Sequence, residues 1–580
     1  MKTVNKWIAL MLVLILTLAL AGEAVADDTW NISYWIPVGE DSTYYSSYEE
    51  NPVILWLNKN KTFNGKTINW DFVVGSPGAQ QDDWSRLMAV GDYCDIMDMS
   101  MANVTAKELY EEGMIWDITK LVEEHVPSLM AELEKSPWLK EYFYTNVDGE
   151  NKILALRGIM DSPEPIFEGY CYRRDWIAKY GKNPVTGEAF TYGFTDPADD
   201  STWFDDVVFP NGTDEPIYIS DWEWMMDIFA TALQDLGITD GYCFAPYYTG
   251  YLAIGDLYSG FGGGAPNWYL EDGNVINGYT SENMRAYLEC LNTWYKNGWI
   301  DKRFDERTSE MFYTINSPGV FQGKVGLWQG RASTTGTQIR MEGTASADAM
   351  VFGCRQPIND LYGGDAQKNK APNYMYQFKR YGGSVVFTDK MSEDEIIAVL
   401  DMMEYTFSEE GWKLANLGLD SEQVKDILPN SFVSKYGLEE GFYTYDEASQ
   451  LYQPLIALSD TTNAATKLNR FTPKYGVVSL IDHGYRRYEQ QAEDAWTYYE
   501  STAELPDSVL YGVTTDQNQE ITRINASLTQ FLERSVPAII KGEGYDIWND
   551  ADWEKFVKDV VKYRADRITE YYQEAYDATH

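Results

Sequence analysis

Histidine and cysteine are scarce in this chain. The 580 residues include only three histidines, His125, His483 and His580, which lie far apart without an HExxH pattern. Metal chemistry that depends on imidazole ligands is therefore nearly excluded. The five cysteines are widely spaced and form no CxxC pair. Because neither a disulfide-dense scaffold nor a zinc site fits that spacing, we expect mostly isolated, buried thiols, with room for one buried disulfide.

Nucleotide-binding and esterase motifs are missing as well. The sequence contains no GxSxG and no GxGxxG, and Gly323-Lys324 lacks the Walker spacing. It has 90 acidic residues, but a glycoside hydrolase needs two carboxylates at a defined separation, and no pattern locates such a pair. The sequence therefore predicts a protein that is not an enzyme. Its many Trp, Tyr, Asp and Glu residues leave a secreted glycoside hydrolase as an alternative.

Positive charge is also sparse, and the net charge of −44 is spread along the chain without long single-sign blocks. Such a surface repels phosphate backbones and anionic lipid headgroups, which argues against nucleic-acid and membrane-surface partners and favours solubility. Apolar residues make up 44% of the chain, enough to fill the two or three domains expected at this length. No hydrophobic run after residue 26 approaches the length of a bilayer span.

An apolar segment near the N-terminus ends in LALAGEAVADD (18–28). The uncharged run Ile8–Gly22 follows a basic start and is shorter than the roughly 20 residues that span a bilayer. Small residues before Ala26 predict a signal peptide over 1–26, cleaved after Ala26. Glu23 stands where a lipobox would have its Cys. We therefore expect an exported protein, periplasmic or extracellular at the cell surface, without a lipid anchor; retention of the uncleaved segment is the alternative.

Strand and helix patterns alternate in the first part of the mature chain. The expected strands are Trp30–Pro37, Thr67–Val74 and Asp95–Met99, and the expected helices are Asn51–Phe63, Asp83–Val90 and Ala106–Leu121. This alternation predicts a parallel, doubly wound α/β sheet with ligands at the carboxyl ends of its strands. An acidic, Gly/Pro-rich insertion interrupts the pattern at 190–220. Further helices are expected at Asp221–Leu236, Ser281–Asn297 and Trp553–Tyr571.

Eight phrases, taken in order, resemble extracellular solute-binding protein family 1 of bacterial ABC importers, most of whose members bind carbohydrates. The phrases are DDWSRLMAVGDYCDIM (82–97), LYEEGMIWDIT (109–119), VDGENKILALR (147–157), CYRRDWIAKYGKNP (171–184), LNTWYKNGWIDKRF (291–304), FQGKVGLWQG (321–330), FSEEGWKLANLGL (407–419) and VPAIIKGEG (536–544). The chain departs from the family where Cys94 replaces a usual Pro, and where Arg157 ends the third phrase. The Cys that anchors tethered relatives is missing.

The resemblance implies a two-lobed, type II periplasmic-binding-protein-like fold with the ligand cleft at the hinge. It places the first part of the N-lobe at 27–155, the main part of the C-lobe at 156–370, and the hinge crossovers, the rest of both lobes and the C-terminal helices at 371–580. The chain should return from the C-lobe near 370–390 and then cross again. The implied function is capture of an oligosaccharide or glycan fragment by interlobe closure and its delivery to ABC permease subunits, by a monomer. A peptide or another small solute is the alternative ligand.

Sugar recognition needs flat aromatic faces and planar polar groups for paired hydroxyls. Strand ends and loops supply nine predicted ligand contacts: Tyr34, Trp35, Gln80, Asp83, Ser100, Arg174, Trp268, Trp328 and Gln329. Each aromatic residue has core packing as its alternative, and Arg174 fits a salt bridge at the hinge equally well. Arg331 is a similar, weaker candidate.

The acidic loop DPADDSTWFDD (196–206) offers oxygen ligands for a structural calcium ion. The predicted ligands are Asp196, Asp199, Asp200 and Asp205. The loop lacks the Gly and the terminal Glu of an EF-hand, although some large members of the resembled family hold calcium. The alternative is a solvated loop, and no other cofactor is expected.

Overall fold

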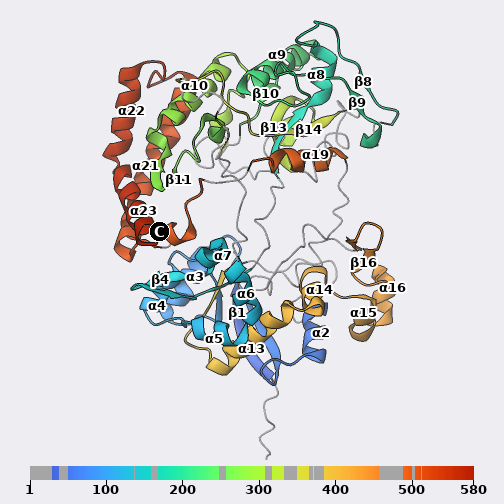
Figure 1. Ribbon diagram of the computed structural model, residues 1–580, viewed down its shortest axis with the longest axis vertical. Coiled ribbons are helices and arrows are strands. Elements are labelled where there is room, and N and C mark those ends of the chain that lie inside the picture. The colour runs from blue at the N-terminus through green and yellow to red at the C-terminus, as the bar shows by residue number, and fades with distance from the viewer. Residues whose placement is uncertain are drawn as a thin grey trace, which may run out of the picture. The chain divides into compact units, whose positions relative to one another are not determined.

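Figure 1 shows the computed structural model of the chain. The described residues are 29–37, 50–135, 137–158, 168–196, 199–246, 257–306, 317–331, 349–364, 370, 372, 384–455, 487–499, 503–510 and 512–579. The predicted signal peptide, 1–26, lies outside them. In the part of the chain that is described, no helix is long and apolar enough to cross a membrane. No two of the five cysteines form a disulfide, and all five thiols are buried, as the spacing predicted.

The chain divides into two compact units. Unit 1 comprises residues 1–161 and 382–481, and unit 2 comprises residues 162–381 and 482–580. The first change of unit, after residue 161, comes a few residues later than the predicted boundary at 155. The second, after residue 381, falls inside the predicted interval of 370–390. The third, after residue 481, divides the segment 371–580, in which the sequence predicts a further crossing without fixing its position.

The sheet of unit 1 has five strands in the order β2-β1-β3-β15-β6. Their bounds are β1 Thr29–Ile36, β2 Thr67–Val74, β3 Ile96–Asp98, β6 Leu156–Arg157 and β15 Ser384–Phe387. β1 is parallel to β2 and β3, as the sequence predicted, whereas β15 runs antiparallel to both β3 and β6. The second pass of the chain through unit 1 therefore inserts one reversed strand into an otherwise parallel sheet.

Ten helices and two hairpins of the described residues complete unit 1. They are α2 Pro52–Asn60, α3 Gln80–Val90, α4 Ala106–Glu111, α5 Thr119–His125, α6 Pro127–Lys135, α7 Pro137–Phe143, α13 Glu393–Thr406, α14 Glu409–Leu417, α15 Ser421–Ile427, α16 Asn430–Tyr436, β4 Thr145–Val147 with β5 Glu150–Lys152, and β16 Tyr443–Asp446 with β17 Leu451–Pro454. The single helix predicted over Ala106–Leu121 is two helices. Its first part ends before Gly113, whose φ of 74° lies in the left-handed region that terminates helices.

The sheet of unit 2 has the order β10-β13-β7-β14. Its strands are β7 Glu168–Arg173, β10 Tyr242–Phe244, β13 Val325–Arg331 and β14 Val351–Cys354. β7 is antiparallel to β13 and β14, so β10, β13 and β14 end at the same edge. Alternate residues of β7 enter different clusters: Tyr170 and Tyr172 join the large core of unit 2, and Cys171 joins the cluster beside α19, Arg487–Trp496.

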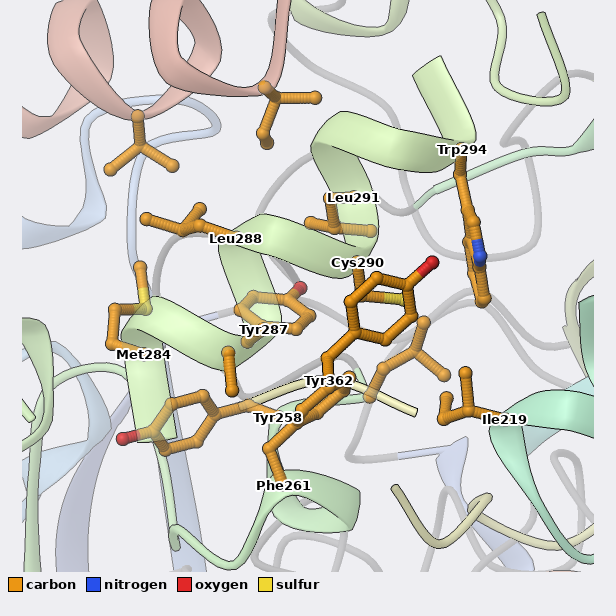
Figure 2. Close-up of a cluster of buried hydrophobic side chains, with 14 of the residues drawn as sticks. Ile219, Tyr258, Phe261, Met284, Tyr287, Leu288, Cys290, Leu291, Trp294 and Tyr362 are labelled. Carbon is orange, nitrogen blue, oxygen red and sulfur yellow. The ribbon is translucent and has the colours of Figure 1, made fainter. Parts of the chain in front are cut away.

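The remaining elements of unit 2 surround this sheet. They are α8 Arg174–Tyr180, β8 Tyr192–Gly193, β9 Phe204–Asp205, α9 Ile219–Asp235, β11 Trp268–Glu271, β12 Asn274–Asn277, α10 Glu282–Lys296, α11 Ser317–Phe321, α20 Asp507–Leu510, α21 Thr515–Lys541, α22 Asp550–Lys562 and α23 Ala565–Thr579. Figure 2 shows one face of α10 packing Met284, Tyr287, Leu288 and Leu291 into the core. The helix predicted over Trp553–Tyr571 is divided at Arg564, which has a φ of 65°.

Two glycines let α19 lie directly on the sheet of unit 2. A Cβ on Gly169 would lie 2.4 Å from the Trp496 ring, and one on Gly353 would lie 2.4 Å from the Ala492 Cα. The Trp496 indole nitrogen donates to the Tyr170 carbonyl at 2.9 Å, so the buried ring is held at its polar atom as well. The last pass of the chain is thereby fixed against β7 and β14.

Trp496→Ala should lower the free energy of unfolding of unit 2 by about 3–5 kcal/mol, because it leaves a cavity against two glycines and removes the bond to Tyr170. Urea denaturation followed by circular dichroism measures this change. Gln490→Ala, at an exposed position of the same helix, is the control and should change stability by less than about 0.5 kcal/mol. Equal stabilities of the two variants would contradict this account of the packing.

Candidate functional site

The carboxyl ends of parallel strands meet at one edge of the unit 1 sheet. Ile36 pairs with Val74, and Trp35 pairs with Met97. Ser384 pairs with Arg157 at the same edge. The residues that follow β1, β2, β3 and β6 therefore start from one side of the sheet, where open α/β folds bind ligands.

Three predicted ligand contacts lie at this edge. Gln80 begins α3, Asp83 lies in its first turn, and exposed Ser100 lies in the turn after β3. The Asp83 carboxylate accepts the Ser76 amide at 2.8 Å, and the hydrogen bonds from Ser76 hold the pKa of Asp83 below its usual range. The Ser100 amide donates to buried Asp98 at 2.8 Å. The structure thus places these three polar residues after β2 and β3, where the sequence put them, and their contact with a ligand stays a prediction.

Arg157 adds a cation to the same edge. It ends β6, and its guanidinium lies 4.5 Å from the Tyr142 ring centroid. The sequence showed this residue only as a departure from the family phrase. Its position after a strand of two residues explains why strand patterning did not assign it to the edge.

The structure corrects the predicted roles of Tyr34 and Trp35, both of which are buried. Tyr34 belongs to one core cluster of unit 1, and Trp35 packs with Trp84 and Met88 in another. Since side chains of a strand alternate between two covered faces, neither ring presents a face for stacking. The backbone of Gly75 passes close to the Trp35 ring: a Cβ on Gly75 would lie 3.0 Å from the indole.

The aromatic and amide candidates of unit 2 are also buried. Trp328 lies in the middle of β13, not at its end, and packs in the cluster that contains Trp496. Gln329, next along the strand, is buried as well.

Trp268 donates from its indole nitrogen to the Thr569 hydroxyl at 2.9 Å and packs against the rings of Tyr279 and Tyr572. These three residues support the core of unit 2, which corrects their prediction as ligand contacts. The side chain of Arg331 lies outside the described ones.

Arg174 makes a buried ion pair, which was one of its two predicted roles, but it does so inside unit 2. Its guanidinium lies 2.6 Å from an Asp205 carboxylate oxygen, and it also donates to the Tyr172 hydroxyl at 2.9 Å and to the Asp214 carbonyl at 2.7 Å. These bonds tie the insertion 190–220 to the start of α8. The prediction that Arg174 forks across ligand hydroxyls is therefore corrected.

The four predicted calcium ligands have other partners or positions. Asp205 binds Arg174, the buried Asp200 carboxylate accepts the Tyr488 amide at 2.9 Å, and Asp199 accepts the Ser201 amide at 3.1 Å. Among the residues described, including Asp196, no group of three or more His, Cys, Asp or Glu side chains could hold a metal ion. Calcium binding stays a prediction, without a ligand set in this structure.

A polar cluster that the sequence did not reveal lies where β14 ends in unit 2. Arg355 follows Cys354, and its guanidinium contacts the Glu215 carboxylate. The same guanidinium lies 3.6 Å from the ring centroid of Tyr498, whose side chain is 59% exposed. Tyr499 lies next along the chain, and burial raises the pKa of its hydroxyl. The apolar run VFGC, which is followed by Arg355 and shortly afterwards by a Pro, indicates where the strand ends. No local pattern indicates the contact with Tyr498, because that residue lies 143 positions further along the chain.

Several solved structures with a similar fold are described as solute-binding or substrate-binding proteins. A substrate-binding protein of Streptococcus pneumoniae, FusA in complex with kestose, is 15% identical with a TM-score of 0.60, over 94% of this chain and 99% of that one. An extracellular solute-binding protein of Bifidobacterium longum subsp. infantis is 14% identical with a TM-score of 0.62, over 96% and 99%. An HMO-binding protein of the same organism is 14% identical with a TM-score of 0.59, over 95% and 99%. No protein-family profile and no curated protein matches the sequence. The chain thus has the two-lobed, periplasmic-binding-protein-like α/β fold that the sequence predicted.

Arg174→Met should lower the free energy of unfolding by about 3–5 kcal/mol, because it leaves the Asp205 carboxylate buried without its cation. Thermal and urea unfolding measure the loss. The double variant Arg174→Met with Asp205→Leu removes both charges and should recover part of that stability. A single variant as stable as the parent chain would contradict the structural role of Arg174.

Proposed function

We propose that this chain is the exported substrate-binding component of a bacterial ABC importer for an oligosaccharide or glycan fragment. It binds its ligand without catalysis and passes it to membrane permease subunits. Ligand binding favours a closed arrangement of the two units, so that the importer recognises the loaded form. The proposal is supported by the likeness of almost the whole chain to substrate-binding proteins, and by the surfaces at the carboxyl ends of both sheets.

The stacked pair of Arg355 and Tyr498 is the observation that supports a saccharide as the ligand. One face of the Tyr498 ring is covered by the Arg355 guanidinium, while the side chain remains 59% exposed. An exposed aromatic ring supported from behind suits the C–H face of a sugar ring, and the guanidinium beside it can donate two parallel bonds to neighbouring hydroxyls. Glu215 fixes the guanidinium in place.

The edge of the unit 1 sheet, taken by itself, also offers polar groups. Gln80, Asp83 and Ser100 offer amide, carboxylate and hydroxyl oxygens, and Arg157 offers a cation. Such mixed donors and acceptors suit a polyhydroxylated ligand, whose hydroxyl groups both donate and accept hydrogen bonds. The structural neighbours support the same class, since one holds kestose and another is named as HMO-binding.

Tyr498→Ala and Arg355→Met should each weaken oligosaccharide binding at least fivefold, corresponding to a loss of about 1–3 kcal/mol for a stacking platform. The ligand is first selected on a glycan array, and calorimetry on the chain from Asp27 then measures the dissociation constants. Chromatography should recover the sugar intact.

The matched control is Tyr445→Ala, a tyrosine that is 49% exposed on β16 of unit 1 and lies outside both edges. It should leave the affinity unchanged. Dissociation constants that are the same for Tyr498→Ala, Arg355→Met and the parent chain would contradict the assignment of the site.

A further inference from the structure

A hollow lies in unit 2 among residues that belong to neither sheet edge. It has a volume of about 590 Å³, within the range of roughly 300–1,000 Å³ that is usual for small-molecule sites. Its walls come from the first half of α10, the loop 361–364 and the connection between α21 and α22. Glu282, Arg285, Glu289, Leu361 and Trp548 line it.

Trp548 is 48% exposed but firmly held. Its indole nitrogen donates to the Asn292 side-chain oxygen at 2.9 Å, and the Asn292 amide donates in turn to the Ile539 carbonyl at 2.9 Å. Asn292 itself is buried in α10. A solvent-facing ring that is already fixed by hydrogen bonds loses little entropy when a ligand stacks on it.

The polar wall of the hollow comes from α10. Arg285 lies 2.7 Å from the Asp550 carboxylate and 3.4 Å from Glu289, and Glu282 accepts the Trp553 indole nitrogen at 3.0 Å. Burial raises the pKa of Glu289. Carboxylates outnumber the single guanidinium on this wall, which disfavours an anionic ligand. The carboxylate oxygens accept and the guanidinium donates, so the wall suits a ligand that both donates and accepts hydrogen bonds, as sugar hydroxyls do.

The loop 361–364 forms the floor and the entrance. Figure 2 shows Tyr362 among Ile219, Cys290 and Trp294, so the floor is part of the core of unit 2. At the entrance, a Cβ on Gly364 would meet nothing within 4 Å. Leu361 is exposed there as well. A rigid floor, an open entrance and an apolar rim opposite polar groups are the features of a preformed pocket.

We propose that this hollow is a second saccharide site, which binds one terminal sugar unit of a neutral glycan by stacking on Trp548 and by hydroxyl contacts to Glu289 and Arg285. It is separate from the Arg355–Tyr498 surface and does not depend on that surface being a ligand site. It gives the protein a weaker, independent hold on glycan chains through unit 2 alone.

Fluorine NMR of the protein labelled with 5-fluorotryptophan tests this proposal, with Trp548→Phe assigning the resonance. The probes are maltotriose, kestose, chitotriose and mannotriose, and the protein carries Tyr498→Ala. Each saccharide is added up to about 50 millimolar, a range that covers millimolar dissociation constants. At least one saccharide should shift the Trp548 resonance saturably. Glu289→Gln and Arg285→Met should each raise the midpoint at least fivefold, and Arg534→Met, an exposed arginine of α21, should leave it unchanged.

Two results overturn the proposal: no saturable shift of the Trp548 resonance with any of the four saccharides, or a shift with choline chloride at lower concentration than with any saccharide. The calorimetry of Tyr498→Ala and Arg355→Met tests the proposed function separately, because those two substitutions lie at the sheet edge and not in the hollow. Loss of either site therefore leaves the measurement of the other intact.

Discussion

The packing of α19 on the sheet of unit 2 is the contact on which the proposed binding surface depends. Trp496 fits over Gly169 because that residue has no side chain, and its indole nitrogen is satisfied by the Tyr170 carbonyl. Two residues later the chain reaches Tyr498, which meets Arg355 at the end of β14. The packed end of α19 thus sets an exposed ring beside a strand end that is more than a hundred residues away in sequence.

Ion pairs with carboxylates hold three arginine side chains of this acidic chain in fixed positions. Arg174 is held by Asp205, Arg355 by Glu215 and Arg285 by Asp550 and Glu289. Each guanidinium has a planar fork that matches a carboxylate, so its orientation is fixed as well as its charge. In the first case the pair anchors an insertion, whereas in the other two it leaves the guanidinium at a solvent-accessible hollow or edge.

The local alternation of apolar and polar residues is sufficient to predict the first two strands of unit 1. The alternation in TWNISYWI and TINWDFVV fixed β1 and β2 closely, and strand order then placed Gln80, Asp83 and Ser100 at one edge. The same alternation could not tell a ligand-facing ring from a core ring, so Trp35 and Trp328 were assigned to the ligand although helices cover them. Arg355 and Tyr498 were missed because their contact joins two passes of the chain, which no local pattern encodes. The antiparallel β15 was missed for the same reason.

The central claim is that the proposed oligosaccharide ligand binds at the Arg355–Tyr498 pair of unit 2. Hydrogen–deuterium exchange on the chain from Asp27, with and without a saturating array-selected oligosaccharide, tests it most directly, because the peptide that follows β14 is resolved from the rest of the chain. The account predicts slower exchange in residues 355–358 when the oligosaccharide is present. Unchanged exchange in that segment at saturation would contradict it.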